Sequence, residues 1–442
     1  MQRARIHLLS SCQQCIRHQQ WRTLASSSAS QPKPKIEATG PLKGIKILDL
    51  GRVLAAPYAS MILGDLGADV IKIEQPGSGD DTRHWGPPFA KNIDPNDTGK
   101  PESAYFLGIN RNKKSMTVNL KHPDGVAIIK KLAAKCDILI ENYLPGKLDE
   151  MGLGYEVMKQ INPRLIYASV TGYGPTGPDS QKPGYDLMIE AEAGLMYITG
   201  ERDGPPVKVG VAITDMVTGL YAHGGILAAL IARQKTNRGQ KVDVSLIESQ
   251  AAALANIAHN WLIGGVEASR WGTSHPSIVP YQRFPTKDSF VVVGAGNDRQ
   301  FGKLVDVMGM GEFKSDERFR TNDGRVKNRV VLIETMSNIF KTQTTEYWLK
   351  ALEPINIPFA PVNNIAQTFA HPQVIHRKMI EEVDHPRAGK IKIAGIPVKY
   401  SGTPPNVRLP PPVLGQHTRE VLSTFLDYSD NEIDAFIAEK VV

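Results

Sequence analysis

The chain has 442 residues, of which 41% are hydrophobic and 22% charged, so it has room for roughly two or three domains and is too apolar for a disordered chain. It contains no run of about 18 apolar residues, which argues against a membrane-spanning helix. The net charge is +7, but residues 1–40 carry +5 of it and leave only +2 on the remainder. A body this close to neutral does not favour nucleic-acid binding, because phosphate backbones require a basic surface.

The composition also gives no support to a disulfide framework or a metal centre. The three cysteines, Cys12, Cys15 and Cys136, are too few for either a set of disulfides or a four-cysteine zinc site. We expect Cys136 to be a small buried apolar side chain rather than a reactive thiol. The 11 histidines are scattered and form no H-E-x-x-H pair, so no metal site is expected.

The first 40 residues have the character of a targeting segment. Residues 1–30 are rich in Arg, Ser and Gln, and the first acidic residue of the chain is Glu37. This composition is typical of a mitochondrial transit peptide, which predicts a matrix protein, and a merely disordered basic terminus is the alternative. The Ser-, Pro- and Lys-rich residues 26–40 are interpreted as a linker. We therefore assign residues 1–40 to transit peptide and linker and leave them out of the fold.

From residue 41 onward, short apolar strands alternate with helices. Strands are predicted at 45–50, 69–74, 116–120, 137–141, 165–170 and 241–245. Helices are predicted at 58–66, 124–135, 215–233 and 248–262. Strands that alternate with helices in this way predict an α/β fold with a parallel sheet.

The pattern changes near residue 270, where prolines cluster. A strand is predicted at 290–293, and helices at 298–309 and 326–355. Pro-rich strands at 395–400 and 404–412 and a terminal helix complete the prediction. We interpret 41–269 as the first part of a large domain, 270–365 as a small domain, and 366–442 as a C-terminal part that returns to the large domain.

Common nucleotide and hydrolase motifs are missing from the sequence. There is no G-x-x-x-x-G-K-[ST] loop, no G-x-G-x-x-G after the first strand, and no G-x-S-x-G elbow. The first strand is instead followed by the small residues of GRVLAAP (51–57), which would let a phosphate or a nucleotide edge approach a helix N-terminus. A plain tight turn explains this segment equally well.

The strongest candidate for chemistry is Asp215, in the segment GVAITDMVTG (210–219). It lies at the opening of an apolar helix, whose N-terminus is expected to lower the pKa of the carboxyl group and keep it ionised. An ionised and desolvated carboxylate is a competent nucleophile toward an activated acyl group. The alternative is an ordinary acidic residue at a helix N-terminus. Asp186, in the segment PGYD, has the corresponding alternative of an acidic turn residue.

Taken together, these segments resemble the class III coenzyme A transferases, and the matching stretches begin at Leu42 and run almost to the end of the chain. They are GIKILDLGRVLAAPYASMILGDLGADVIKIEQPGSGDDTR (44–83), NRNKKSMTVNLKHPDG (110–125), DILIENYLPGKLDEMGLGYE (137–156), NPRLIYASVTGYGPTGP (162–178), PGYD (183–186), the Asp215 segment, NRGQKVDVSLIES (237–249) and HPSIVPYQRF (275–284).

The resemblance implies both a fold and a reaction. The fold is a Rossmann-like large domain formed by both chain ends plus a smaller α/β domain, with a ring-like chain in an interlocked homodimer. The reaction moves coenzyme A from an acyl-CoA, here succinyl-CoA, to a dicarboxylate such as glutarate. Asp215 falls at the nucleophilic position and would pass through an anhydride and an aspartyl–CoA thioester. No cofactor is expected, because the coenzyme A thioester is itself a substrate.

The resemblance also assigns binding residues. For coenzyme A these are Val53, Leu54, Ala55, Gln75, Val118, Lys121, Asn142, Tyr143 and Leu144. For the acyl group and acceptor they are Tyr105, Tyr185, Arg111 and His275. Each has a structural alternative: the loop could be only a turn, the tyrosines only core aromatics, and Lys121 only a solvated charge.

The sequence departs from the resembled pattern at two positions. Many members have Arg where this chain has Leu144 and Glu150, which puts the phosphate contacts there in doubt. Lys147 is a possible substitute, and the remaining cationic candidates are Arg83, Lys113, Lys114 and Lys121. A dicarboxylate further requires a cation for its far carboxylate, and Arg52, Arg111, His275 and Arg283 are the candidates.

Two alternative functions stay open from the sequence. The first is a racemase of the α-methylacyl-CoA type, which uses a His and Asp pair. That branch has A-G-H-D where this chain reads PGYD, and residues 123–222 contain no histidine. The second is a non-catalytic CoA-binding protein, which is disfavoured because Asp215 is present.

Overall fold

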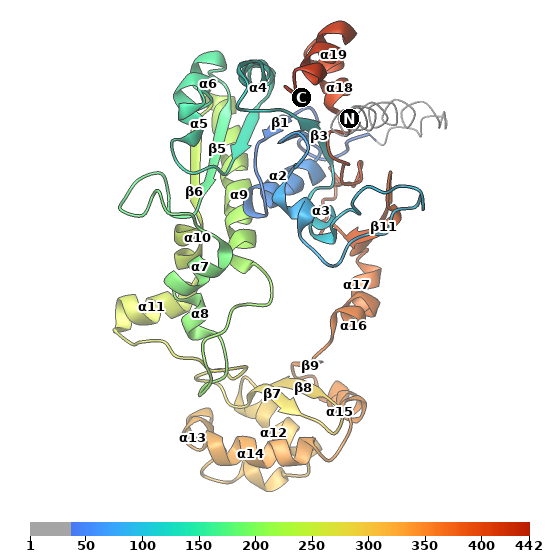
Figure 1. Ribbon diagram of the computed structural model, residues 1–442. Helices are drawn as coiled ribbons and strands as arrows, with labels where there is room; N and C mark the ends of the chain where they lie inside the picture. Colours follow the sequence, from blue (N-terminus) through green and yellow to red (C-terminus); the bar gives the residue numbers. More distant parts are fainter. Residues whose placement is uncertain (1–36) are drawn as a thin grey trace, which may run out of the picture. The chain divides into compact units, whose positions relative to one another are not determined.

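A parallel six-stranded sheet organises the first half of the computed structural model, which describes residues 37–442 (Figure 1). The predicted transit peptide lies almost wholly outside this range. The strands are β1 (Lys46–Asp49), β2 (Asp69–Glu74), β3 (Lys113–Thr117), β4 (Ile138–Glu141), β5 (Ile166–Thr171) and β6 (Lys241–Ser245). Their spatial order is β3-β2-β1-β4-β5-β6 and all neighbouring pairs are parallel, which is the Rossmann order. The predicted α/β fold is therefore confirmed.

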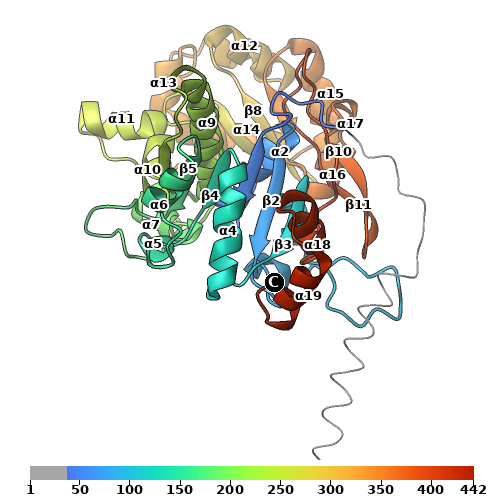
Figure 2. The same ribbon diagram turned by 90° about the horizontal axis from the view of Figure 1, so that it is seen from above.

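Helices cover both faces of this sheet. Ile47 points to one face, where it packs in a hydrophobic cluster with α2 (Ala55–Asp65) and α9 (Ile213–Thr236). Leu48 points to the other face and packs with α4 (Pro123–Lys135) and α6 (Tyr155–Ile161). Figure 2 shows the sheet lying between α4 and the pair α2 and α9. Because both faces are buried, the central strands β4 (ILIE) and β5 (IYASVT) are buried along their whole length rather than in alternation.

The C-terminal residues pack against this same sheet. After α18 (Thr418–Glu420) and a single π turn, α19 (Asp430–Ala438) places Ile433 in the cluster on the α4 side. The amide of Asn119 donates to the carbonyl of Val441 at 2.8 Å. Both ends of the chain therefore build one sheet layer, as the resemblance implied.

A second, smaller α/β part has its own hydrophobic cluster. Its antiparallel strands are β7 (Tyr281–Pro285), β8 (Phe290–Gly294) and β9 (Phe359–Pro361). Its helices are α12 (Asp298–Val307), α13 (Asn322–Lys327), α14 (Arg329–Phe340) and α15 (Thr345–Leu352). Phe284 stacks on Phe340 at 4.8 Å between ring centroids. Residues 39–442 form one compact unit, so the boundaries at 270 and 365 stay predictions.

The remaining helices are mostly short. They are α3 (Ala104–Ile109), α5 (Lys147–Glu150), α7 (Asp186–Glu192), α8 (Leu195–Ile198), α10 (Leu246–Ala253), α11 (Ala255–Gly264), α16 (Ile365–Ala370) and α17 (Pro372–His376). The predicted helix at 248–262 is two helices, because Ala255 has a φ of 46° and interrupts the hydrogen-bond ladder.

The Pro-rich strands predicted at 395–400 and 404–412 were wrong. The structure forms its C-terminal hairpin earlier, from β10 (Ile380–His385) and β11 (Gly389–Ala394). Proline has no amide hydrogen, so the Pro-rich segments cannot supply a regular ladder. Cys136 is buried as expected, and burial raises the pKa of its thiol to about 12.

Buried ion pairs explain why β3 was predicted three residues too late. Lys113 opens this strand with a fully buried ammonium group, 3.0 Å from the carboxylate of Asp49. Lys72, in β2, is equally buried and lies 2.8 Å from the carboxylate of Asp80. Charged residues thus occupy core positions of these strands. A search for apolar runs therefore does not find where such a strand begins.

The sequence-based exclusion of any bilayer-length helix was too strict. The 24 residues of α9 are apolar and long enough to cross a membrane by composition, and 33% of the apolar window is buried. In the structure α9 packs on α2 and on the sheet, and Arg233 near its end pairs with Asp137 at 3.0 Å. These contacts are those of a core helix with one uncovered side.

We expect Lys72→Ala to lower the free energy of unfolding by about 3–5 kcal/mol, because it leaves Asp80 as an unpaired buried charge. Lys390→Ala is the matched control, since the Lys390–Glu382 pair is 72% and 48% exposed. Its loss should stay below about 1 kcal/mol. Urea unfolding followed by circular dichroism measures both changes, and equal losses would contradict a structural role for the buried pair.

Candidate active site

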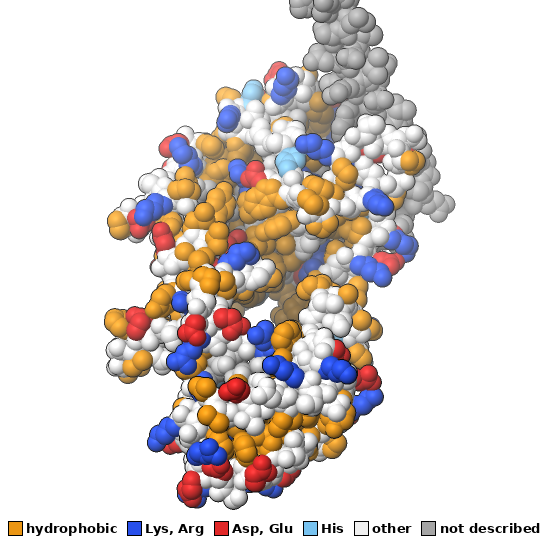
Figure 3. All heavy atoms as spheres, turned by 60° about the horizontal axis from the view of Figure 1, so that its bottom comes forward, with side chains coloured by type: hydrophobic (Ala, Val, Ile, Leu, Met, Phe, Trp, Pro, Cys, Tyr) orange, Lys and Arg blue, Asp and Glu red, His pale blue; other side chains and the backbone are white. Residues whose placement is uncertain are grey.

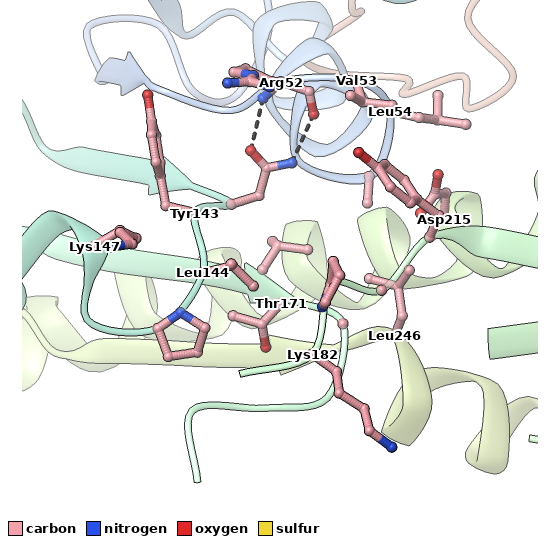
Figure 4. A pocket seen from close by; sticks show the side chains of 18 of the residues that line it. Arg52, Val53, Leu54, Tyr143, Leu144, Lys147, Thr171, Lys182, Asp215 and Leu246 are labelled. Carbon is pink, nitrogen blue, oxygen red and sulfur yellow. Dashed lines mark hydrogen bonds between the residues drawn. The ribbon is translucent and has the colours of Figure 1, made fainter. Parts of the chain in front are cut away.

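A cavity of about 360 Å³ lies at the carboxyl ends of the parallel strands, where the strand order reverses between β1 and β4. This is the position at which open α/β sheets bind ligands. The lining residues are Arg52, Val53, Leu54, Ala55, Asn142, Tyr143, Leu144, Pro145, Lys147, Val170, Thr171, Gly172, Ser180, Lys182, Pro183, Gly184, Tyr185, Asp215 and Leu246. Figure 4 shows Asp215 at one end of this cavity, with Leu54 nearby and Lys147 toward the other end.

Asp215 belongs to the first turn of α9 and is only 8% exposed. Burial is the main cause that raises the pKa of its carboxyl group to about 7, and the neighbouring Asp186 carboxylate raises it further. The expected lowering by the helix N-terminus is therefore outweighed. A carboxylate that ionises near pH 7 is poorly solvated, and poor solvation makes it a stronger nucleophile than a surface Asp.

Asp186 holds the start of α9 in place. One of its oxygens, Oδ1, accepts from the amides of Thr214 at 2.8 Å and Asp215 at 3.3 Å. The hydroxyl of Thr214 in turn donates to Gln250 in α10 at 2.7 Å. The helix that carries Asp215 is thus capped by a side chain from α7 rather than by its own N-cap residue.

The loop after β1 is held by side chains on both sides. Val53 has a φ of 67°, a strained conformation for a β-branched residue, and its amide donates to Asp80 at 3.2 Å. Asn142 fixes the same loop from β4, since it accepts from the Arg52 amide at 2.8 Å and donates to the Arg52 carbonyl at 2.7 Å (Figure 4). Asn142 was predicted to contact coenzyme A, but its amide group is used here to join two loops.

These contacts leave the start of α2 open toward the cavity. Leu54 precedes the helix and provides no side-chain cap for its first turn. Leu54 and Ala55 both line the cavity. Uncapped amides at a helix N-terminus are donors suited to an oxyanion or a phosphate.

Of the two predicted tyrosines, Tyr185 lines the cavity with Asp215, whereas Tyr105 does not line it but lies close enough to feel the Asp215 charge. Burial first, and then the carboxylates of Asp215 and Asp186, raise the pKa of Tyr105 to about 12. Its phenol therefore stays protonated and available as a hydrogen-bond donor. The ring of Tyr105 packs edge to face on Trp85, 5.4 Å between centroids, whereas Tyr185 is 56% exposed at the cavity rim.

A second cavity of about 380 Å³ adjoins the first and shares Arg52 and Tyr143 with it. Its lining includes Gln75, Val118 and Lys121. The structure thus brings the predicted coenzyme A residues together in two neighbouring cavities along one edge of the sheet. That continuity suits a long ligand with a nucleotide at one end and an acyl group at the other.

Several predicted cations lie elsewhere. Arg111 is 4% exposed and bound through two nitrogens to Asp65, at 2.8 and 2.6 Å. Arg283 pairs with Glu201 at 3.3 Å, and His275 packs on Tyr281 just before β7. None of the three lines either cavity. Arg111 therefore has a structural role here, and its predicted contact with substrate is not what the structure displays.

Of the cations predicted to bind the phosphates of coenzyme A, some are held in ion pairs and others line a cavity. Arg83 and Lys113 are buried in ion pairs with Glu74 and Asp49, and Lys114 pairs with Glu420. Lys147 does line the cavity, and its ammonium group lies 2.9 Å from Glu150.

Sequence reasoning missed Lys182, Thr171 and Leu246 as lining residues. Lys182 pairs with Asp179 at 2.7 Å, and in Figure 4 its ammonium group points away from Asp215. Thr171 closes β5, so the rule that ligands bind at the carboxyl ends of parallel strands could have identified it.

Comparison with known proteins shows the family to which the chain belongs. The family model for CoA-transferase family III matches residues 42–418. The human succinyl-CoA:glutarate CoA-transferase is 50% identical over 412 residues, which cover 93% of this chain and 92% of the human one. A succinate–glutarate CoA-transferase of Agrobacterium fabrum is 41% identical and covers 87% and 95%. The crystal structure of a CAIB/BAIF family protein from Brucella suis superposes with a TM-score of 0.80 at 40% identity, covering 87% and 99%.

The raised pKa of Asp215 predicts a pH-dependent cost to stability. Between its ordinary value of 3.8 and about 7, the folded chain holds one proton more than the unfolded chain, so stability falls as pH rises through this window. The total loss is about 4 kcal/mol at most.

Asp215→Asn removes this loss, so the variant should be more stable than wild type at pH 8 and close to it at pH 4. Urea unfolding at the two pH values measures the difference. A stability difference that does not change with pH would contradict the raised pKa.

Proposed function

Because this chain belongs to CoA-transferase family III, we propose that it transfers coenzyme A from succinyl-CoA to glutarate and related dicarboxylates, with Asp215 as the nucleophile. The observation that carries the proposal is the buried carboxyl group of Asp215 at the end of a ligand-sized cavity. The named activities of the human and Agrobacterium relatives support succinyl and glutaryl groups as the substrate class.

The proposed reaction begins with attack of the Asp215 carboxylate on the thioester carbonyl of succinyl-CoA. The C–S bond breaks, which leaves an aspartyl–succinyl anhydride and the thiolate of coenzyme A. The thiolate then attacks the aspartyl carbonyl and releases succinate, so that Asp215 carries coenzyme A as a thioester. Glutarate attacks this thioester to give a second anhydride, and return of the thiolate yields glutaryl-CoA and the free carboxylate.

Each step passes through a tetrahedral oxyanion that needs hydrogen-bond donors. In our proposal the donors are the open amides at the start of α2, beside the cavity, and the phenol of Tyr105, whose pKa is raised by the Asp215 carboxylate. The anhydride must also be kept from water, and the burial of Asp215 serves this purpose. Every covalent step uses an atom of the chain or of a substrate, so no cofactor is invoked.

The racemase alternative finds no support in the cavity. Among residues 37–442 no histidine lines it, and Tyr185 occupies the position before Asp186 where a racemase of this type has His. Asp186 is moreover committed to capping α9. A proton-abstracting His and Asp pair is therefore not assembled by the described residues.

We further propose that the enzyme is a homodimer of interlocked chains. Apolar residues are exposed on α9 and α11, with Ile231, Leu262 and Ile263 at 60%, 73% and 82%. Figure 3 shows broad hydrophobic areas between scattered charged side chains. Exposed apolar surface of this kind marks an interface, and a second copy of the chain would cover it. Import into the mitochondrial matrix is proposed from the acid-free segment before Glu37.

We expect wild-type protein supplied with succinyl-CoA and glutarate to form glutaryl-CoA, and Asp215→Asn to reduce this rate roughly a thousandfold or more. Mass spectrometry of the acyl-CoA products measures the transfer. Asp306→Asn, an exposed Asp paired with Lys314, is the control and should transfer at the wild-type rate. Unchanged transfer by Asp215→Asn would disprove its role, and α-proton exchange in its place would favour the racemase.

The pH dependence of kcat/KM should follow the ionisation of Asp215 in the free enzyme. The nucleophile must be ionised, so kcat/KM should rise about tenfold per pH unit below 7 and level off above it. Initial rates at subsaturating succinyl-CoA between pH 5.5 and 8.5 test this, with substrate stability checked in parallel. If kcat/KM stayed constant down to pH 5.5, the pKa of the Asp215 carboxyl group would not be raised.

A further inference from the structure

The C-terminal hairpin contacts a segment that leads directly into the active site. Residues 85–104 form a loop whose two ends pair with each other, because Ala90 donates to the carbonyl of Glu102 at 2.8 Å and Ala104 donates to that of Pro88 at 3.2 Å. The loop is followed by α3, which carries Tyr105. Its two ends meet again where Trp85 packs on the ring of Tyr105. The loop therefore contacts Tyr105 and leads into the helix that carries it.

Arg387, in the turn between β10 and β11, clamps this loop from outside. Its Nε donates to Asp97 at 2.9 Å, and its guanidinium also donates to the Lys100 carbonyl at 3.1 Å and to Glu102 at 3.3 Å. In the opposite direction, the amide of Ile93 donates to the Arg387 carbonyl at 2.8 Å. One residue thus contacts the loop at four places.

Hydrogen bonds within the turn also fix its backbone, and this orients Arg387 toward the 85–104 loop. His385 is 2% exposed, and its Nδ1 accepts from the amides of Arg387 at 3.1 Å and Ala388 at 3.0 Å. Gly99 makes room for the guanidinium, since a Cβ there would lie 2.5 Å from Arg387 Nη2. The contact therefore depends on a small residue in the loop as well as on the arginine.

Charges of alternating sign continue from this clamp to the strand ends. Glu102 is 5% exposed and lies between Arg387 and Arg83, each 3.3 Å away. Arg83 binds Glu74 through two nitrogens at 2.7 and 2.8 Å and stacks on Phe106, the neighbour of Tyr105, at 3.6 Å. Glu74 then accepts from the amide of Asp80, which holds Val53. The clamp is thus connected to both walls of the site.

We propose that Arg387 is a positioning residue for the transferase reaction, which holds Tyr105 against the Asp215 side of the cavity through the 85–104 loop. This inference rests on the proposed function. Arg387 touches no substrate, so its loss should affect the covalent steps and the exclusion of water more than the binding of coenzyme A. Arg387 itself lines neither cavity, and the second cavity is lined by Gln75 and Lys121 among others.

The test compares Arg387→Met with Arg387→Lys in the full-length protein, with Lys390→Ala in the same hairpin as the control. Hydrogen exchange followed by mass spectrometry measures the loop directly, without any substrate. We expect faster exchange across residues 88–104 in Arg387→Met and unchanged exchange in Lys390→Ala. Unchanged exchange in Arg387→Met would overturn the proposal, whether or not the chain transfers coenzyme A.

Kinetics then test the consequence for the reaction. Arg387→Met should lower kcat for transfer on the order of tenfold, leave KM for succinyl-CoA within about twofold, and raise the share of succinyl-CoA lost to hydrolysis. Arg387→Lys keeps the positive charge and one hydrogen-bond donor, so its kcat should lie between those of wild type and Arg387→Met. A normal kcat with a raised KM for succinyl-CoA would contradict the positioning role.

Gly99→Ala provides a second variant that leaves Arg387 in place and only displaces it. It should reproduce the faster exchange and part of the loss in kcat. Gly402→Ala, where a Cβ meets nothing within 4 Å, is its control. If wild-type protein transfers no coenzyme A, the proposed function fails, and the exchange experiment still decides whether Arg387 holds the loop.

Discussion

The site depends on buried ion pairs beneath the carboxyl ends of β1, β2 and β3. The side chains of Lys72 and Lys113 are fully buried, each within 3.0 Å of a carboxylate. Lys72 also donates to the Gly51 carbonyl at 2.7 Å, and its partner Asp80 accepts from the Val53 amide. Charges buried in this way are costly unless every partner is in place. The network therefore tolerates only one arrangement of the loop after β1, and that loop forms a wall of the cavity.

The carboxyl group that we propose as the nucleophile lies in the opposite kind of environment. Asp215 is only 8% exposed, but the charged group that most affects it is a second carboxylate, Asp186. One oxygen of Asp186 accepts from the amides of Thr214 and Asp215. These bonds fix the position of Asp215 without neutralising its charge. The same interior thus contains carboxylates paired with lysines, such as Asp49 and Asp80, and the carboxylate of Asp215, whose charged neighbour is a second carboxylate. A carboxylate whose charge is destabilised in this way is the group expected to attack a thioester.

A parallel α/β sheet was predictable from apolar runs, and Asp215 was a candidate because an acid opens an apolar helix. The Rossmann-like fold and the role of Asp215 as nucleophile came from the family resemblance. β6 matches its predicted limits because its residues follow the pattern. β3 does not, since Lys113 is buried through a partner 64 residues away, which no local window includes. From the sequence, Arg111 was a candidate to bind a substrate carboxylate, but in the structure it already binds the carboxylate of Asp65. These roles depend on partners that are distant in the sequence, so they could not be predicted without the tertiary structure. The same holds for Lys182 and for Arg387.

In the reaction that we propose, coenzyme A passes through a covalent bond to Asp215. Wild-type protein should be incubated with succinyl-CoA, treated with borohydride and digested, and the peptide containing Asp215 analysed by mass spectrometry. Borohydride reduces an aspartyl–CoA thioester to the alcohol, so the account predicts this change at Asp215 alone, together with loss of transfer. Transfer of coenzyme A to glutarate with Asp215 left unmodified, or modification of another carboxylate instead, would contradict it.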